Sequence, residues 1–509
     1  MLLAKLYRTG LLTPLGLFYL MRAIGTTGVN LMALLQVAAQ LHSRRVAVTD
    51  DRGQCTYLQL WQQAEQLALA LQVDYGIQRQ QKVAIAGRNH AALIKAIFAL
   101  SRLGAHVFLL NPEMSGDQLQ SLLNHLAIDF YIYDPEAETP LPPWLEAMHQ
   151  SRKALPTYHA TAPSIDQLSS QARATSRRLK TVKTGTIVVM TGGTTGHPKP
   201  ASRKPSILNF LPPFIALLQQ VELDRYRSLY IATPIYHGFG LAALLIGILL
   251  GGELYIVPRF QVAQAFDLIA RYRIEVVTLV PLMLQRLLNH GAGSLESLQR
   301  ILSGGAALPP TLVQATLTQL GPILFNLYGT SEAGFCILAT PTLLRRKPAS
   351  IGRPLGGVAA RIVTDRDSGS NSQIGHLCIR SAWSTSQNRW IETGDLAYRD
   401  PEGDVFLCGR VDDMVVSGGE NVYPVDLENI LMKHPAIDAV VVFGIPDAEF
   451  GQRLKAVVVK HPQAELSEAG LRDWLKPQIA RYQMPAVIEF RDELPYTSLG
   501  KLDRKVLRE

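Results

Sequence analysis

The sequence predicts an α/β protein: a large N-terminal domain of parallel-rich sheets covered by helices, and a small mobile α+β C-terminal domain. Apolar β-branched runs alternate with helical patterns from residue 83 onwards, which is typical of βαβ units and parallel sheets. Near residue 400 charged turns cluster, and the residues beyond them carry enough strands and helices for a second core. We therefore expect domains at 1–409 and 410–509.

The expected elements of the large domain follow in chain order. Strands are expected at residues 83–86, 106–110, 130–133, 186–190, 228–232, 253–257 and 276–280. Helices are expected at 91–102, 118–125, 263–272 and 282–290, with another from about residue 241. In the small domain we expect a helix opened by Pro424, strands at 440–443, 456–459 and 487–490, and a helix at 471–479.

Composition narrows the classes of function. The chain has 509 residues, 47% of them hydrophobic, and a net charge of +8, so it is globular and suited to anionic partners. No basic cluster is interleaved with aromatic residues, which argues against a nucleic-acid partner. The four cysteines show no Cys-x-x-Cys spacing, so we expect neither a zinc site nor disulfides, and a cytoplasmic location fits.

The N-terminus carries a short apolar segment, residues 10–21, between Arg8 and Arg22. It is shorter than the roughly 20 apolar residues that a membrane span needs, and Pro14 interrupts it. No small-residue cleavage site follows, so it differs from a signal peptide. We expect an amphipathic or docked segment, with peripheral contact to the inner face of a membrane as a hypothesis.

A loop rich in glycine and threonine follows the expected strand at 186–190. Glycines let backbone N–H groups approach a ligand closely, and hydroxyl and ammonium groups suit phosphate oxygens. The loop lacks the Gly-Lys-Ser/Thr ending of common nucleotide triphosphatases. A flexible surface turn is the alternative to a polyphosphate site. The expected phosphate-binding residues are Thr191, Gly192, Gly193, Thr194, Thr195, Gly196 and Lys199.

Four further segments follow this loop in order: residues 303–308, residues 327–332, Glu392–Asp395 with residues 409–413, and a pair at 416–424 and 495–504. Taken singly, they could be a tight turn, a surface carboxylate, an ion pair and a solvated tail. Together with the loop, they resemble the adenylate-forming (AMP-binding) superfamily, which contains acyl-CoA synthetases, luciferases and nonribosomal adenylation domains. The resemblance runs from about Arg45 to the C-terminus.

The resemblance implies an ATP site around Tyr328, Gly329, Thr330, Ser331 and Glu332. In the family the aromatic residue lies against adenine, and the hydroxyl at the Ser331 position meets the α-phosphate. The carboxylate at the Glu332 position holds Mg²⁺, which suits a hard, oxygen-ligated cation.

Two other segments complete the nucleotide site that the resemblance implies. Gly304, Gly305 and Ala306 would line the adenine and acyl pockets, where small residues leave room for a bulky substrate. Asp395 would accept hydrogen bonds from the ribose hydroxyls. Arg410 would contact the ribose or a phosphate.

The small domain supplies the remaining residues that the resemblance implies. Lys501 would be the catalytic lysine of adenylate formation, and Asp412 the hinge between the domains. Ser417, Gly418 and Gly419 would form a hairpin that enters the site for thioester formation with CoA.

The resemblance implies an ATP-dependent ligase that joins a carboxylic acid to CoA through an acyl-adenylate. The N-terminal half resembles bacterial fatty acyl-CoA synthetases, so a medium- or long-chain fatty acid is the expected substrate. His237 would position the carboxylate, unless it is an ordinary core histidine. The alternatives are an aryl acid–CoA ligase, an acyl-AMP ligase that loads a carrier protein, and a non-catalytic acyl- or nucleotide-binding or fatty-acid uptake protein.

Overall fold

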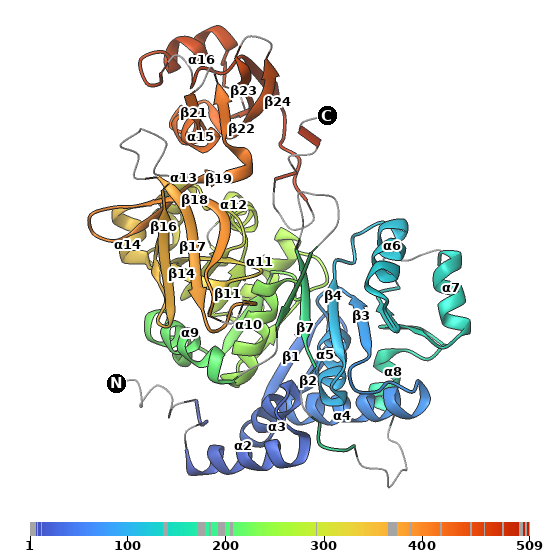
Figure 1. The fold of residues 1–509 in the computed structure, drawn as a ribbon. Helices are drawn as coiled ribbons and strands as arrows, with labels where there is room; N and C mark the ends of the chain where they lie inside the picture. Colours follow the sequence, from blue (N-terminus) through green and yellow to red (C-terminus); the bar gives the residue numbers. More distant parts are fainter. Residues whose placement is uncertain are drawn as a thin grey trace.

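The structure, a computed structural model, contains three β-sheets with helices packed against them (Figure 1). It describes residues 7, 9–11, 13–135, 141–171, 179–182, 185–191, 199–203, 207–291, 293–364, 374–386, 388–417, 420–447, 450–462, 464–480, 483–497, 502–503 and 506–507.

One sheet has six strands in the order β6-β5-β3-β4-β7-β8, and all neighbours are parallel except β7 and β8. Its strands are β3 (Lys82–Ala86), β4 (His106–Leu110), β5 (Phe130–Tyr133), β6 (Ala154–Pro156), β7 (Ile187–Thr191) and β8 (Lys199–Arg203). One face packs on α4 (Tyr57–Asp74), α5 (Ala91–Leu103) and α8 (Ile165–Ser170). The other face packs on α6 (Gly116–Leu126) and α7 (Pro143–Gln150).

The largest sheet has 13 strands in the order β16-β17-β18-β19-β15-β14-β13-β12-β11-β9-β10-β1-β2. Its parallel half comprises β1 (Val46–Asp50), β10 (Glu253–Tyr255), β9 (Ser228–Ile231), β11 (Val276–Leu279), β12 (Arg300–Gly304) and β13 (Leu324–Thr330). The antiparallel strands are β2 (Gly53–Thr56), β14 (Gly334–Ala339), β15 (Ser350–Pro354), β16 (Val358–Val363), β17 (Gly375–Ser381), β18 (Ile391–Arg399) and β19 (Val405–Arg410).

Helices cover both faces of the parallel half of this sheet. One face packs on α11 (Val262–Tyr272), α12 (Pro281–His290), α13 (Pro310–Leu320) and α14 (Pro341–Arg346). The other packs on α9 (Ile207–Gln220) and α10 (Gly238–Leu249), and a 3₁₀ turn, η1 (Leu223–Arg225), follows α9. Helix α10 also packs with α3 (Leu31–Leu41), α4 and α5, so it fills the space between the two large sheets.

The small sheet lies at the top of Figure 1 and follows β19 through the 3₁₀ turn η2 (Val411–Asp413). Its strands are β20 (Val415–Ser417), β21 (Glu420–Val422), β22 (Ile437–Asp447), β23 (Gly451–Lys460) and β24 (Val487–Arg491). Helices α15 (Pro424–Leu431) and α16 (Glu468–Leu475) cover one face. Leu494, Leu502 and Leu507 of the C-terminal tail pack on the other.

The predicted fold class is confirmed, and residues 106–110 and 130–133 form strands with the expected bounds. Helix α10 begins at Gly238, earlier than expected, and α16 ends at Leu475, earlier than residue 479. The apolar segment is divided at Pro14, as expected, because the described residues 10, 11 and 13 lie outside the helix and α2 (Pro14–Thr27) begins at the proline. The missing N–H of Pro14 costs nothing at the first helical position, and the Thr13 side chain caps the helix.

No helix in the described ranges is long and apolar enough to cross a membrane.

A charged cluster joins the turn between β18 and β19 to β15. The Asp404 side chain is fully buried and lies 2.8 Å from Lys347 Nζ and 2.7 Å from Arg353 Nε. Burial raises the pKa of Asp404, but the hydrogen bonds from Lys347 and Arg353 outweigh burial, so its pKa lies below the ordinary value. A carboxylate with a lowered pKa stabilises the fold above its unfolded pKa of about 4, and this stabilisation is lost as pH falls further.

We expect Asp404→Asn to lower the apparent melting temperature by several degrees at pH 7, because Lys347 and Arg353 lose a buried counter-charge. The difference from the wild type should shrink as pH falls below about 4, because the unfolded chain then takes up a proton at Asp404 before the native state does. Thermal unfolding at pH 7 and across the acid range measures both effects. Asp492→Asn, at an exposed carboxylate, is the control. A constant difference at all pH values would contradict the ion-pair explanation.

Candidate active site

The carboxyl ends of strands from the two large sheets meet at one edge. Asn89, which follows β3, is buried; its Nδ2 donates to the Thr233 carbonyl at 3.0 Å and its Oδ1 accepts from Ile235 N at 2.8 Å. Thr233 and Ile235 follow β9 of the other sheet. Ligands of parallel sheets bind beyond such carboxyl ends, so this edge is the candidate site.

A second bridge crosses the same edge. Glu113, which follows β4, pairs with Arg88 Nε at 3.0 Å and with Arg259 Nη2 at 3.2 Å. Arg259 follows β10, so the pair again joins the two sheets. Arg88 also lies 3.5 Å from the buried Asp134, which follows β5. The strand ends are therefore joined to one another by polar contacts, of which those of Asn89, Arg88 and Asp134 are buried.

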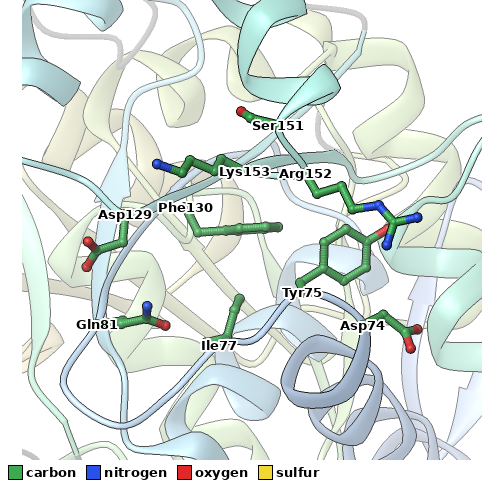
Figure 2. A pocket seen from close by; sticks show the side chains of 9 residues that line it. All are labelled: Asp74, Tyr75, Ile77, Gln81, Asp129, Phe130, Ser151, Arg152 and Lys153. Atoms are coloured by element: carbon green, nitrogen blue, oxygen red, sulfur yellow. The ribbon is translucent and has the colours of Figure 1, made fainter.

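A cavity of about 310 Å³ lies at the opposite edge of the six-stranded sheet. Figure 2 shows Gln81, Asp129 and Lys153 around it, and these residues precede β3, β5 and β6. It lies at the amino ends of the strands, so it is separate from the candidate site.

Tyr328, Asp395 and Arg410 form one cluster at the candidate site. The Tyr328 hydroxyl donates to Asp395 Oδ2 at 2.5 Å, and Arg410 Nη1 donates to Asp395 Oδ1 at 3.2 Å. The Asp395 side chain is 13% exposed and that of Arg410 is 47% exposed, so the cluster opens toward solvent on the arginine side. Burial and the Asp395 carboxylate hold the pKa of Tyr328 far above its ordinary value, so its hydroxyl stays a donor.

Local backbone structure sets this arrangement. Asp395 and Arg410 are direct partners on the antiparallel strands β18 and β19. Gly394 has φ +76°, and a Cβ there would lie 2.8 Å from the Arg410 guanidinium, so only glycine leaves that side chain in place. The Thr393 hydroxyl accepts from Asp395 N at 3.2 Å and donates to the Leu377 carbonyl at 2.9 Å. These two bonds tie the backbone at Asp395 to the neighbouring strand β17.

The Gly-rich turn at 304–306 lies beside Tyr328, because Gly304 is the partner of Leu327 on the parallel strands β12 and β13. A Cβ on Gly304 would lie 2.6 Å from the Leu327 carbonyl oxygen and 3.2 Å from the Phe239 ring. The space at Gly304 is thus filled by the protein itself. Gly305 has φ +80°, a left-handed conformation that favours glycine. Ala306 follows directly in the turn and is half-buried.

Glu332 follows β13 two residues after its end and is half-buried. Its backbone carbonyl accepts from Thr385 N at 2.8 Å, whereas no described residue forms an ion pair with its carboxylate. Gly329 and Thr330 form the end of the strand, Ser331 follows them, and the Thr330 hydroxyl accepts from Ala333 N at 3.0 Å. A carboxylate available at the site edge fits the oxygen ligand that Mg²⁺ prefers.

No group of three His, Cys, Asp or Glu residues that could hold a metal ion occurs among the described residues.

His237 precedes α10 and is half-buried, with its ring centroid 4.6 Å from that of Tyr236. Its backbone N–H donates to the Pro234 carbonyl at 3.1 Å. The Asn89 carboxamide holds the same segment at Thr233 and Ile235. His237 therefore lies two residues beyond the point where the two sheets are joined.

Several predicted site residues lie outside the described part of the chain: Gly192, Gly193, Thr194, Thr195, Gly196, Gly418, Gly419 and Lys501. The side chains of Thr191, Lys199, Asp412 and Ser417 also lie outside it. Their roles stay predictions. The described backbone pairs Thr191 with Lys199 at the ends of β7 and β8, and pairs Tyr496 with Leu502 in the C-terminal tail. Burial raises the pKa of Tyr496, and Arg286 of α12 lies near enough for its charge to offset part of that rise.

Fold and site define a two-domain α/β protein with a polar cluster at the carboxyl edge of its parallel strands, the position of a small-molecule ligand site. The family model described as "AMP-binding enzyme" matches residues 35–387, and that described as "AMP-binding enzyme C-terminal domain" matches residues 426–501. The chain belongs to the AMP-binding enzyme family.

Individual relatives extend the comparison. A 2-succinylbenzoate–CoA ligase of Staphylococcus aureus (strain MSSA476) is 34% identical over 329 residues. That match covers 63% of this chain and 66% of the relative, slightly under two thirds of its length. The structure of o-succinylbenzoate CoA synthetase from Bacillus subtilis, in complex with its acyl-adenylate intermediate, has a TM-score of 0.80 and 26% identity, covering 94% of this chain and 98% of that one. The amide bond synthetase McbA from Marinactinospora thermotolerans has a TM-score of 0.80 and 25% identity, with 94% and 99% covered.

Asn89 was missed as a site residue by the sequence analysis. Its position directly after an expected strand was a usable signal, since polar residues there lie at the binding edge of a parallel sheet. Its partners follow a strand of a different sheet, so no local pattern could name them.

We expect Tyr328→Phe to raise the KM for ATP about tenfold, because Asp395 loses one of the two donors that orient it. The ring stays in place, so the change isolates the hydroxyl. Steady-state pyrophosphate release at varied ATP measures the effect. Tyr398→Phe removes a hydroxyl from the same strand, β18, and is the matched control. An unchanged KM for ATP in Tyr328→Phe would show that the bond does not serve the nucleotide.

We expect Asn89→Ala to raise the KM for the acid about tenfold and to leave the KM for ATP near the wild-type value. The lost contacts hold the segment that carries His237, whereas the Tyr328–Asp395 cluster lies elsewhere. Asn124→Ala is the control, because that asparagine is exposed near the end of α6 and takes no part in either bridge between the sheets. Equal damage to both KM values would point to a general loss of structure.

Proposed function

We propose that this protein is an ATP-dependent acid–CoA ligase that activates an aryl carboxylic acid as its acyl-adenylate and transfers it to CoA. One observation carries the proposal. The Tyr328–Asp395–Arg410 cluster lies at the carboxyl ends of the parallel strands. The chain that carries it aligns over 94% of its length with a structure that holds an acyl-adenylate.

The class of acid is the finer part of the proposal. The sequence analysis favoured a medium- or long-chain fatty acid, whereas two of the relatives compared above are named for succinylbenzoate, an aryl acid. These comparisons support the aryl alternative better than the fatty acid.

Asp395 is suited to hold the ribose. A carboxylate offers about four lone-pair positions, and the Tyr328 hydroxyl and the Arg410 guanidinium each donate to one oxygen of Asp395. These two bonds orient the carboxylate, whose oxygens are suited to accept hydrogen bonds from the hydroxyls of a ribose. Because Asp395 is mostly buried, these bonds would be stronger than in water.

Adenylate formation brings a carboxylate toward a polyphosphate, so negative charge must be offset. The Thr191–Lys199 loop and Lys501 would supply backbone N–H groups and ammonium groups for this purpose. Glu332 would hold Mg²⁺, which would supply positive charge to offset the charge of the phosphates. His237 would orient the acid at the start of α10.

Thioester formation would follow a rotation of the small domain about Asp412, with Ser417, Gly418 and Gly419 entering in place of Lys501. CoA is the proposed acceptor because both succinylbenzoate relatives are named as CoA ligases or synthetases, whereas McbA is an amide bond synthetase. A carrier protein is the alternative acceptor, and a non-catalytic acyl-binding or uptake protein is the alternative of a different class.

The test is a pyrophosphate-release screen over aryl acids, including 2-succinylbenzoate, and straight-chain fatty acids, each with and without CoA. We expect release with an aryl acid and thioester formation only when CoA is present. Release with fatty acids alone would restore the fatty-acid interpretation. No release with any acid would support the binding-protein alternative.

Lys501→Ala provides the mechanistic control. It should lower pyrophosphate release by several hundredfold, as expected for the loss of a charge that stabilises the transition state, and should largely spare thioester formation from preformed acyl-adenylate. Equal loss in both half-reactions would contradict the exchange of Lys501 for the 417–419 hairpin.

A further inference from the structure

Helix α2 lies at the edge of the molecule, at the opposite end of Figure 1 from the small domain. Its inner face, with Gly16, Ala23 and Thr27 buried, packs on α3. Surface helices normally place polar residues on the outer face. The outer face of α2 instead carries four large apolar side chains: Leu15, Leu17, Phe18 and Met21, which are 54%, 44%, 57% and 74% exposed.

This exposure is concentrated. Fourteen large apolar side chains lie exposed in the described ranges, and six of them fall between residues 7 and 29. Single exposed apolar residues are common, but a contiguous group on one helix face marks a contact surface. The match to the family model begins at residue 35, after the end of α2.

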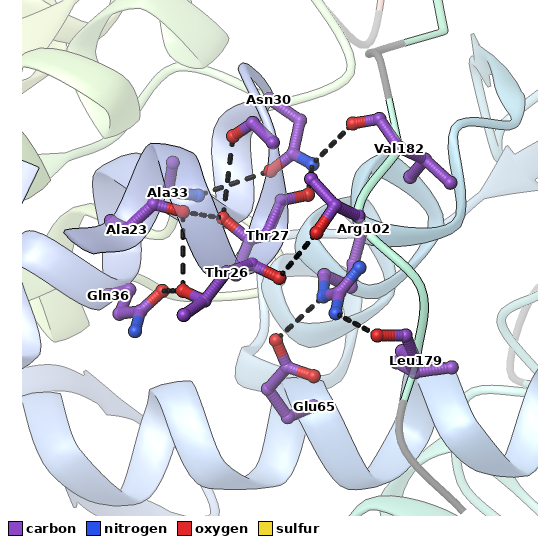
Figure 3. A network of polar contacts seen from close by, with 12 residues as sticks. Ala23, Thr26, Thr27, Asn30, Ala33, Gln36, Glu65, Arg102, Leu179 and Val182 are labelled. Carbon is purple, nitrogen blue, oxygen red and sulfur yellow. Dashed lines mark hydrogen bonds and ion pairs between the residues drawn. The ribbon is translucent and has the colours of Figure 1, made fainter. Parts of the chain in front are cut away.

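Polar contacts fix α2 to the body of the protein, as Figure 3 shows. The buried Arg102 donates to the carbonyls of Leu179 and Lys180 at 3.1 and 2.7 Å, and pairs with Glu65 at 2.9 Å. The adjoining Thr181 hydroxyl donates to the Thr26 carbonyl at 3.2 Å.

Asn30 completes the attachment. Its Nδ2 donates to the carbonyls of Thr27 and Val182 at 2.8 and 3.4 Å. The C-terminal end of α2 is thus tied to the segment at 179–182. The apolar face is therefore presented on a fixed element and cannot fold away.

Basic residues lie on and beside α2. Arg22 lies exposed on α2 itself, and Lys180 lies exposed beside its C-terminal end. Arg44 is exposed after α3, whose Leu41 packs against the small apolar cluster that joins α2 and α3. Residues 1–49 contain five Lys or Arg and no Asp or Glu. An apolar face with basic residues around it complements an anionic lipid surface, where side chains enter the acyl region and cations meet headgroups.

From these observations we infer that α2 is a membrane-surface anchor that lays Leu15, Leu17, Phe18 and Met21 into an anionic bilayer. Its 14 residues are too few to cross the hydrocarbon core, so the helix lies in the interface. The ligase proposed above would then work at the lipid surface, although this inference does not rest on that activity.

The test is co-sedimentation of the full chain with vesicles of phosphatidylcholine alone, or with about a third phosphatidylglycerol, at low and high salt. We expect binding to the anionic vesicles that weakens with salt and is much lower on neutral vesicles. Phe18→Ser should lower binding about tenfold, with an unchanged melting temperature because the side chain is exposed. Phe450→Ser, which replaces a phenylalanine that is 40% exposed in the small domain, is the matched control.

A second variant tests the charges: Arg22→Glu with Lys180→Glu should weaken binding to anionic vesicles only. Absence of binding to either vesicle, or equal effects of Phe18→Ser and Phe450→Ser, would overturn the inference. Equal binding to both vesicle types would overturn the anionic requirement. If the protein does not bind vesicles, and light scattering shows a dimer that Phe18→Ser converts to a monomer, the face would be assigned to contact with a second copy of the chain.

Discussion

The Asn89 carboxamide is the contact on which the geometry of the candidate site depends. Two separate sheets must present their carboxyl edges to the same space, and packing of α10 between them does not by itself fix how those edges align. Asn89 donates to one backbone group and accepts from another beyond β9, which sets both position and orientation. Because it is buried, water does not compete for these bonds. The Arg88–Glu113–Arg259 contacts reinforce the same alignment.

The strands and helices could be predicted because they depend on local pattern. The strand at 130–133 is a run of apolar and aromatic residues between polar ones, and its bounds were found directly. Pro14 also divides its segment as local pattern predicts. Proline interrupts a helix in its interior but begins one at its first turn, and the residue before it, Thr13, decides which applies.

The candidate site was predictable only as separate motifs. Tyr328 and Asp395 were each named from sequence, but the hydrogen bond between them joins residues 67 positions apart. It depends on how β13 and β18 are placed within the 13-stranded sheet, which no local pattern contains. The small residue at Gly304 was expected to make room for substrate, whereas the structure fills that room with Phe239 and the Leu327 carbonyl.

This packing changes where substrate selectivity should be sought. If Gly304 serves the contact between β12, β13 and α10, the small size of this residue is required by that packing and not by the acid that is bound. Selectivity is then better sought in the segment between β9 and α10, which Asn89 contacts through backbone groups. Ile235 and Tyr236 of this segment are buried in the core, whereas His237 is half-buried, so a change at His237 would leave the backbone contacts in place. Such an arrangement would let the acid change while the Tyr328–Asp395–Arg410 cluster, on other strands, keeps one nucleotide geometry.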